Sequence, residues 1–208
     1  MSFSTEMIDG LRQRIRESMS DWRFIHTAEV EKMAVRLGEL YAPDKIPMLR
    51  AAALLHDVTK EKTAAEHLEM LRSHGEDVTE FDEASPKTLH ARTAVIAVRD
   101  EYPEFASEEL LSAVGRHTTG DEGMTVCDAI VYLADYIDMS RKFPDCVYLR
   151  DYFWNSKPES MSESDREKHL WQTLVISFDL TLKGLIEENS PISTRTVSAR
   201  NFALLKIR

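Results

Sequence analysis

The sequence has few of the residues that break or cross-link a chain. Among its 208 residues there are only 7 Gly, 7 Pro and 2 Cys. Cys127 and Cys146 are too few for a disulfide framework or for a zinc site made of thiolates. Because Gly and Pro are scarce while Leu, Ala, Glu, Arg and Met are plentiful, the composition favours an all-helical protein.

Positive charge and long apolar runs are also lacking. Lys and Arg total 26 against 36 Asp and Glu, which gives a net charge of −10. A chain this acidic is not expected to coat nucleic acid or to lie on an anionic membrane, so an anionic ligand would need a local cluster of basic groups or metal ions. No stretch approaches 18 apolar residues, and the N-terminal segment MSFSTEMIDGLRQRIRES has no apolar signal core. We therefore expect a cytoplasmic protein without a membrane segment.

Helical periodicity is present along most of the chain, and no period-2 strand of convincing length interrupts it. It predicts helices over 5–18, 21–41, 46–57, 63–74, 87–101, 107–117, 124–139, 165–188 and 195–206. The acidic stretch 76–86 and the polar stretch 155–164 are predicted to be loops. We expect one all-α domain over 1–208, with core helices within roughly 20–140 and C-terminal helices within roughly 165–206 that pack on them.

Six polar residues lie on or at the ends of predicted helices, each beside apolar neighbours: His26, His56, Asp57, His90, His117 and Asp135. Taken singly, each histidine is more often a hydrogen-bonded core residue, and Asp135 could pair with Arg116 or Arg141. Taken together, they would be hard to satisfy by separate hydrogen bonds if all point inward from different helices. Metal sites in helical bundles are built from such inward-pointing side chains.

Only imidazole and carboxylate ligands occur in this set, and these suit Fe, Mn, Zn, Co or Ni better than Mg or Ca. Six ligands are too many for one tetrahedral site with an open position and about right for two ions that share an aspartate. Two ions roughly 3.5–4 Å apart clamp the attacking and leaving oxygens of a phosphoryl displacement. Of the other histidines, His67 and His74 are expected on the surface, and His169 is expected near Trp171 or facing solvent.

The order of these residues along the chain is H…HD…H…H…D, and longer segments accompany it: RFIHTAEVEKMAVRLGELY, ALLHDVTKE, LHARTAV, GRHTTGDEGMTVCDAIVYLADYIDMSRKFPD and TVSARNFALL. These segments resemble the HD-domain metal-dependent phosphohydrolases, and within them the YqeK-type symmetrical bis(5′-nucleosyl)-tetraphosphatases. The resemblance covers most of the chain. It implies an HD-domain helical bundle around a dinuclear metal site that splits diadenosine tetraphosphate into two ADP.

Carried over by position, the resemblance implies one metal ion on His26, His56, Asp57 and Asp135, with Asp57 bridging to a second ion on His90 and His117. Iron is the metal that it suggests first, with Mn, Co, Ni and Zn as alternatives. The implied catalytic residues are Asp57 and Lys60. The positions that match phosphate- and nucleotide-binding positions of the family are Arg23, Lys60, Thr118, Gly120 and Arg141.

The chain departs from the family pattern at several places. Ala91 stands where a Gly is common, Asp121 replaces a common Arg, and Asp138 begins a turn that usually contains Glu-Pro; the segment 151–164 is also unlike the usual short connection. Two alternatives stay open. One is an HD phosphohydrolase acting on a nucleoside monophosphate, a deoxynucleoside triphosphate, a guanosine alarmone or a cyclic nucleotide; the other is a non-catalytic metal- or nucleotide-binding regulator. The expected partner is a small nucleotide, and a homodimer is left open.

Overall fold

The fold is known from a computed structural model that describes residues 3–208. Within these residues it contains helices and connecting turns but no strand, which confirms the all-α prediction. The α-helices are α1 (Thr5–Ser18), α2 (Asp21–Tyr41), α3 (Ile46–Leu55), α4 (Ala64–Ser73), α5 (Glu80–Ala84), α6 (Leu89–Glu101), α7 (Glu108–Arg116), α8 (Val126–Ile137), α9 (Pro144–Asn155), α10 (Glu163–Glu187) and α11 (Thr194–Lys206).

Side-chain caps explain where most of these helices begin. The residues before α1, α2, α4, α5, α7, α8 and α10 are all Ser or Thr, and each side-chain oxygen accepts a hydrogen bond from a backbone N–H of the first turn. At α8 the Thr125 hydroxyl bonds the N–H of Asp128, while the Asp128 carboxylate bonds back to the N–H of Thr125. This reciprocal cap satisfies two donors that the helix itself leaves free, and it fixes the start of the helix that carries Asp135.

Helix α3 lies at the centre of the bundle. It contacts α1, α2, α7 and α8, and the run from Ala51 to Leu55 has no exposed surface. From Ala51 onward α3 is apolar on all sides, and such a segment is stable only where neighbours cover every face. The chain leaves α3 at His56, so the most deeply buried helix positions the His56-Asp57 pair.

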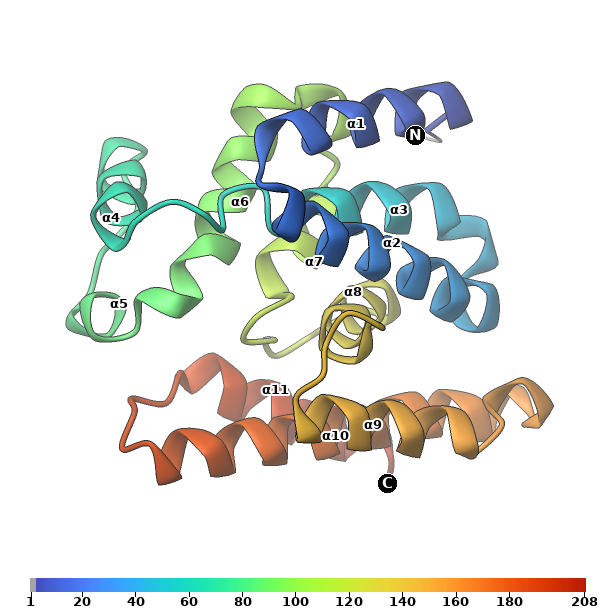
Figure 1. The fold of residues 1–208 in the computed structure, drawn as a ribbon. Coiled ribbons are helices and arrows are strands. Elements are labelled where there is room, and N and C mark those ends of the chain that lie inside the picture. The colour runs from blue at the N-terminus through green and yellow to red at the C-terminus, as the bar shows by residue number, and fades with distance from the viewer. Residues whose placement is uncertain (1–2) are drawn as a thin grey trace.

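The remaining helices pack around this centre in layers (Figure 1). In that view α9, α10 and α11 form the lower layer, α8 lies between this layer and α2, and α4 and α5 project to the left. Helix α10 contacts α8, α9 and α11. One hydrophobic core joins residues from Ile8 in α1 to Ala203 in α11. Among the described residues, no helix is both long and apolar enough to cross a membrane.

Four details differ from the expectations. Helix α5 lies inside the predicted loop 76–86, and α9 forms where no element was predicted; its buried residues Cys146, Leu149 and Phe153 follow helical spacing. His56 and Asp57 lie in the turn after α3 rather than in the helix. The prediction that His67 is a surface residue is wrong: it is buried, and its Nδ1 lies 2.8 Å from the Thr93 hydroxyl, because α4 packs against α6.

Candidate metal centre

The structure brings all six predicted ligands together. His26 comes from α2, His56 and Asp57 from the turn after α3, His90 from the start of α6, His117 from the end of α7, and Asp135 from α8. The four histidines and Asp57 are buried, and Asp135 is mostly covered. Within overlapping groups of three, their nitrogen and oxygen atoms lie within 4.8 Å of one another.

Asp57 stands in the middle of this cluster and divides it. One carboxylate oxygen, Oδ2, lies 3.7 Å from His26 Nε2 and 3.5 Å from His56 Nε2. The other oxygen, Oδ1, lies 3.4 Å from His90 Nε2 and 3.8 Å from His117 Nε2. Each oxygen of a single carboxylate therefore faces its own pair of imidazoles, which is a suitable geometry for a bridge between two cations.

Asp135 adds a second carboxylate next to His26 and His56, and it also forms a group with His117. Its Oδ1 lies 3.0 Å from His26 Nε2 and 3.8 Å from His56 Nε2. The same oxygen accepts a hydrogen bond of 2.5 Å from Nη2 of Arg141. Asp135 is therefore a partner of Arg141, one of the two arginines considered from sequence, and at the same time a member of the cluster.

Three of the histidines are oriented by the main chain in the same way. The Nδ1 of His56 lies 2.6 Å from the carbonyl of Ala53, and the Nδ1 of His117 lies 2.6 Å from the carbonyl of Val114. The Nδ1 of His90 lies 2.9 Å from the carbonyl of Lys87. A carbonyl only accepts, so each Nδ1 must carry the proton and each Nε2 presents its lone pair to the cluster.

His26 is oriented by side chains instead. Its Nδ1 lies 3.2 Å from the Ser140 hydroxyl and 3.4 Å from Oδ2 of the fully buried Asp138. The Ser140 hydroxyl donates its proton to Asp138, so its oxygen accepts from Nδ1–H of His26. Histidines that ligate metals commonly donate their second ring N–H to such a partner. Sequence spacing alone did not predict this role of Asp138 and Ser140, although Asp138 follows Asp135 by three residues.

The donor set fits a bound cation. Nε2 of His26 and Nε2 of His56 are buried and have no hydrogen-bond partner among the described residues. Nε2 of His90 and Nε2 of His117 lie 2.9 Å apart, although the carbonyl bonds leave a lone pair on each. Buried nitrogen lone pairs that face carboxylates and one another are unfavourable unless a positive charge lies between them.

The ionisation of most of the cluster also suits metal binding, since ligands must be deprotonated, whereas His26 holds a proton that a bound cation would displace. Burial lowers the pKa of His56 and His90, and it lowers the pKa of His117 to about 4. Burial raises the pKa of Asp57, but its neighbours, His56 and Lys60 first, give a net shift downward. Burial also lowers the pKa of His26, but the carboxylates of Asp135 and Asp138 outweigh it and raise the pKa to about 9.

Basic side chains and a hydroxyl lie at the edge of the cluster. Nη1 of Arg23 donates to Oδ2 of Asp57 at 2.8 Å, and Nζ of Lys60 lies 3.8 Å from Oδ1 of Asp57. Burial lowers the pKa of Lys60, whose Nζ also lies 2.9 Å from Nε2 of His90. The Thr118 hydroxyl lies 2.9 Å from that same nitrogen.

Two residues close to His117 in the sequence, Gly120 and Arg116, contact other parts of the protein rather than the cluster. Gly120 has a φ of +62°, and a Cβ there would lie 2.7 Å from the Ala199 Cβ and 2.8 Å from the Phe178 ring. Packing of α10 and α11 is thus a sufficient reason for this glycine. Arg116 pairs with the buried Asp128 at 2.9 Å, whereas Asp135 pairs with Arg141.

Known proteins are similar to this chain in sequence and in fold. A family model described as HD domain matches residues 23–140. The chain is 27% identical over 188 residues to a Bacillus subtilis protein named symmetrical bis(5′-nucleosyl)-tetraphosphatase, covering 90% of this chain and 92% of that protein. It is 28% identical over 196 residues to a protein of the same name from Halalkalibacterium halodurans, covering 93% and 95%.

A solved structure shares the fold. It is the crystal structure of a predicted HD superfamily hydrolase involved in NAD metabolism from Clostridium acetobutylicum. The TM-score is 0.81 at 24% identity, with 99% of this chain and 100% of that chain covered. The whole helical arrangement, including α9 to α11, is therefore found in another protein.

Proposed function

This chain belongs to the HD domain family, and on that premise we propose that it is a metal-dependent phosphohydrolase that splits diadenosine tetraphosphate symmetrically into two ADP. The observation that carries the proposal is the division of Asp57, whose two oxygens face two different histidine pairs. A carboxylate shared in this way matches a two-metal centre for phosphoryl transfer. The substrate class is taken from the names of the Bacillus subtilis and Halalkalibacterium halodurans relatives.

The proposed ligands are His26, His56 and Asp135 for one ion, His90 and His117 for the other, and Asp57 for both. Nitrogen and oxygen donors of this kind suit iron, manganese, cobalt, nickel or zinc, and iron is proposed first because of the family resemblance. When bound, such ions would supply Lewis-acid charge and lower the pKa of a water molecule.

The chain's own basic groups are proposed to bind the phosphate chain, since a protein of net charge −10 must gather positive charge locally. Arg23 still has donor capacity, because its buried Nε has no partner among the described residues. Lys60, at the edge of the His90 half, would stabilise the charge that develops on the leaving phosphate oxygen. In the reaction, a water oxygen bonds to a phosphorus in the middle of the chain while the bond to the bridging oxygen breaks, and each half leaves as ADP.

Arg141, Thr118 and Gly120 complete the proposed substrate contacts. Arg141 neutralises Asp135 through Nη2 and still presents a cationic guanidinium next to His26. Thr118 would offer its hydroxyl to a phosphate oxygen beside His90, and Gly120 keeps the following turn close to α10 and α11. The partner is thus proposed to be a small nucleotide.

The experiment has two readouts. Protein purified without added metal is analysed for metal content by mass spectrometry, and we expect close to two ions per chain. Metal-replete protein is then incubated with diadenosine tetraphosphate, and we expect ADP as the sole nucleotide product on chromatography. AMP plus ATP as products would refute symmetrical cleavage, and no turnover with any of the five metals would refute the enzyme.

His56→Ala is the informative variant, because His56 has no exposed surface and its Nε2 faces both carboxylates. We expect it to lose metal and activity. His74→Ala is the matched control, since His74 is a surface residue paired with Asp100. A panel of nucleoside monophosphates, deoxynucleoside triphosphates, guanosine alarmones and cyclic nucleotides tests the alternatives, and faster turnover of any of these would reassign the substrate.

A further inference from the structure

A hollow of about 420 Å³ lies next to the metal centre, on the side of His26. One wall comes from the start of α2, with Trp22, Arg23 and Ile25; the other comes from the connection between α8 and α9, from Ser140 to Pro144. Its size is within the roughly 300–1,000 Å³ typical of small-molecule sites. Of the residues that line it, only Arg23, His26, Ser140 and Arg141 have a role in the proposed metal centre or its substrate contacts.

Large apolar side chains at this hollow are exposed to solvent. Trp22 is 70% exposed, Phe143 is 67% exposed and Ile25 is 59% exposed. Single exposed apolar residues are common, but three that line one concave surface indicate a binding site. Two of the three are aromatic, and aromatic faces are the side chains on which nucleobases stack.

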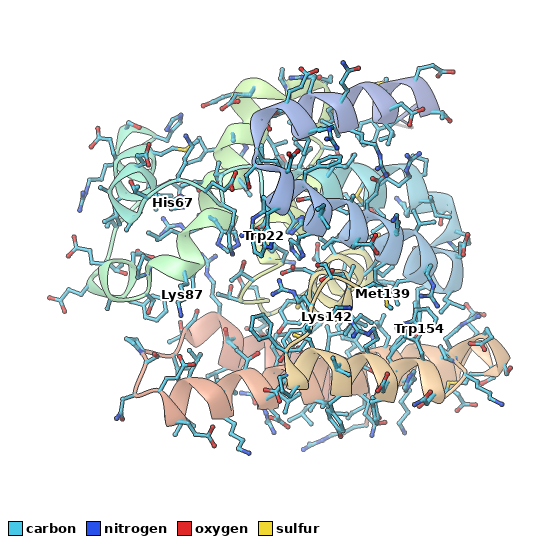
Figure 2. The ribbon with its side chains drawn as sticks, in the orientation of Figure 1. Trp22, His67, Lys87, Met139, Lys142 and Trp154 are labelled. Atoms are coloured by element: carbon cyan, nitrogen blue, oxygen red, sulfur yellow. The ribbon has the colours of Figure 1, made fainter. Side chains whose placement is uncertain are left out.

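Positive charge accompanies these rings. Arg23 and Arg141 line the hollow with Lys142, whose Nζ is exposed and bonds the carbonyl of Met139 at 2.9 Å. Figure 2 shows Trp22 and Lys142 on the same face of the molecule. Aromatic rings beside basic groups are complementary to a ligand that is flat and apolar at one end and anionic at the other.

Arg23 links this hollow to the metal cluster. Its guanidinium carbon lies 4.8 Å from the centroid of the Trp22 ring, and its Nη1 lies 2.8 Å from Oδ2 of Asp57. The imidazole of His26 also lines the hollow. Only the Arg23 side chain would thus separate a ligand that stacks on Trp22 from the Asp57 carboxylate.

We propose that this hollow seats one nucleoside of the substrate, with its base against Trp22 and Phe143 and its 5′-phosphate directed toward Arg23 and the metal centre. The inference rests on the proposed function, because a dinucleoside polyphosphate carries a base at each end of its phosphate chain. A nucleotide fits better than a second copy of this chain, because Arg23, Arg141 and Lys142 line the hollow and His26 connects it to the cluster. Affinity at this end then comes from stacking rather than from hydrogen bonds to base edges, so the seat should discriminate little between bases.

Tryptophan fluorescence tests the contact without any need for turnover. We expect ADP to quench the emission of the wild-type protein, and we expect that quenching to disappear in Trp22→Phe while ADP still binds in equilibrium dialysis. Trp154→Phe is the matched control, because Trp154 lies outside the hollow and stacks on Arg36 at 4.0 Å. Quenching that persists in Trp22→Phe and disappears in Trp154→Phe would overturn the assignment.

Affinity tests the energetic role. Base stacking on an aromatic ring is lost on substitution by alanine, so Trp22→Ala should raise the Kd for ADP and the KM for diadenosine tetraphosphate about 5- to 150-fold. Trp22→Phe should restore most of the loss. Inhibition by inorganic tripolyphosphate, which has no base, should be unchanged. Tyr148→Ala is a matched control, because it removes an exposed aromatic side chain that lies on α9 outside the hollow. It should leave both constants unchanged.

The failure of this inference and the failure of the proposed function give different results. If diadenosine tetraphosphate is cleaved but Trp22→Ala leaves both constants unchanged, the seat is wrong and the function stands. If ADP quenches Trp22 but no dinucleotide is cleaved, the seat stands and the function is wrong. A change of oligomeric state in Trp22→Ala with unchanged ADP affinity would assign the hollow to a second copy of the chain and overturn the proposal.

Discussion

Asp138 gives the most direct test of how the metal centre is built. It is completely buried, its Oδ1 accepts the N–H of Ser140 at 2.7 Å and the Ser140 hydroxyl, and its Oδ2 lies 3.4 Å from Nδ1 of His26. Asp138→Asn keeps the shape and one acceptor but removes the charge behind the imidazole. We expect a folded protein whose His26 is held in place less firmly.

The expected loss of metal affinity in Asp138→Asn follows from the position of Asp138 behind a ligating histidine. Loss of the partner behind a ligating histidine weakens metal binding about 10- to 100-fold, which is about 1.4–2.8 kcal/mol. The contacts of Asp57, His90 and His117 do not involve Asp138, so only one of the two ions should be affected. A titration with Co²⁺, followed by absorption and by competition with a chromophoric chelator, should therefore show one weakened step and one unchanged step.

A matched control and an independent measurement separate this effect from unfolding. Asp145→Asn removes an exposed carboxylate at the start of α9 and should bind both ions as the wild type does. Thermal unfolding in the presence of chelator shows whether Asp138→Asn is folded. If the folded variant binds both ions with wild-type affinity, Asp138 does not orient His26, and the role assigned to it is wrong.

Two further predictions concern the body of the protein. Gly120→Ala should lower the free energy of unfolding by about 2–4 kcal/mol, because the new Cβ would be strained by the left-handed backbone and would also overlap its neighbours. Gly123→Ala has the same strain, with a φ of +75°, but open space around it, so it should cost only about 1 kcal/mol. Equal losses of stability for the two variants in chemical denaturation would refute the packing argument. Burial and the nearby Glu109 raise the pKa of Cys127 to about 12, so its reactive thiolate should be scarce at neutral pH. A thiol reagent should therefore modify Cys127 quickly only after the protein unfolds. Rapid modification of Cys127 in the folded protein would contradict this prediction.

The order of the helices and the membership of the cluster follow from the sequence to a large degree. Helical spacing correctly predicts helices such as 5–18 and 21–41, because an apolar stripe at that spacing has no other good way to be buried. The six polar residues could be grouped because each interrupts an apolar face. What the sequence did not reveal was which residues stand behind them.

Those missing features depend on tertiary contacts. Asp138 and Ser140 reach His26 because of the direction in which the chain turns after α8, and the spacing of residues in the sequence does not predict that direction. His67 has charged neighbours along the chain, yet it is buried because α4 covers α6. Trp22 is the opposite case: it is an aromatic residue inside a helix, but it faces solvent beside the hollow.

The orientation of the histidines has a consequence for how this centre can change. Backbone carbonyls hold His56, His90 and His117, and no substitution can delete a carbonyl. His26 alone depends on side chains, those of Ser140 and Asp138. Substitutions of Ser140 and Asp138, by evolution or by design, can therefore change the affinity of the ion bound by His26. The main chain keeps the other three imidazoles in the same orientation.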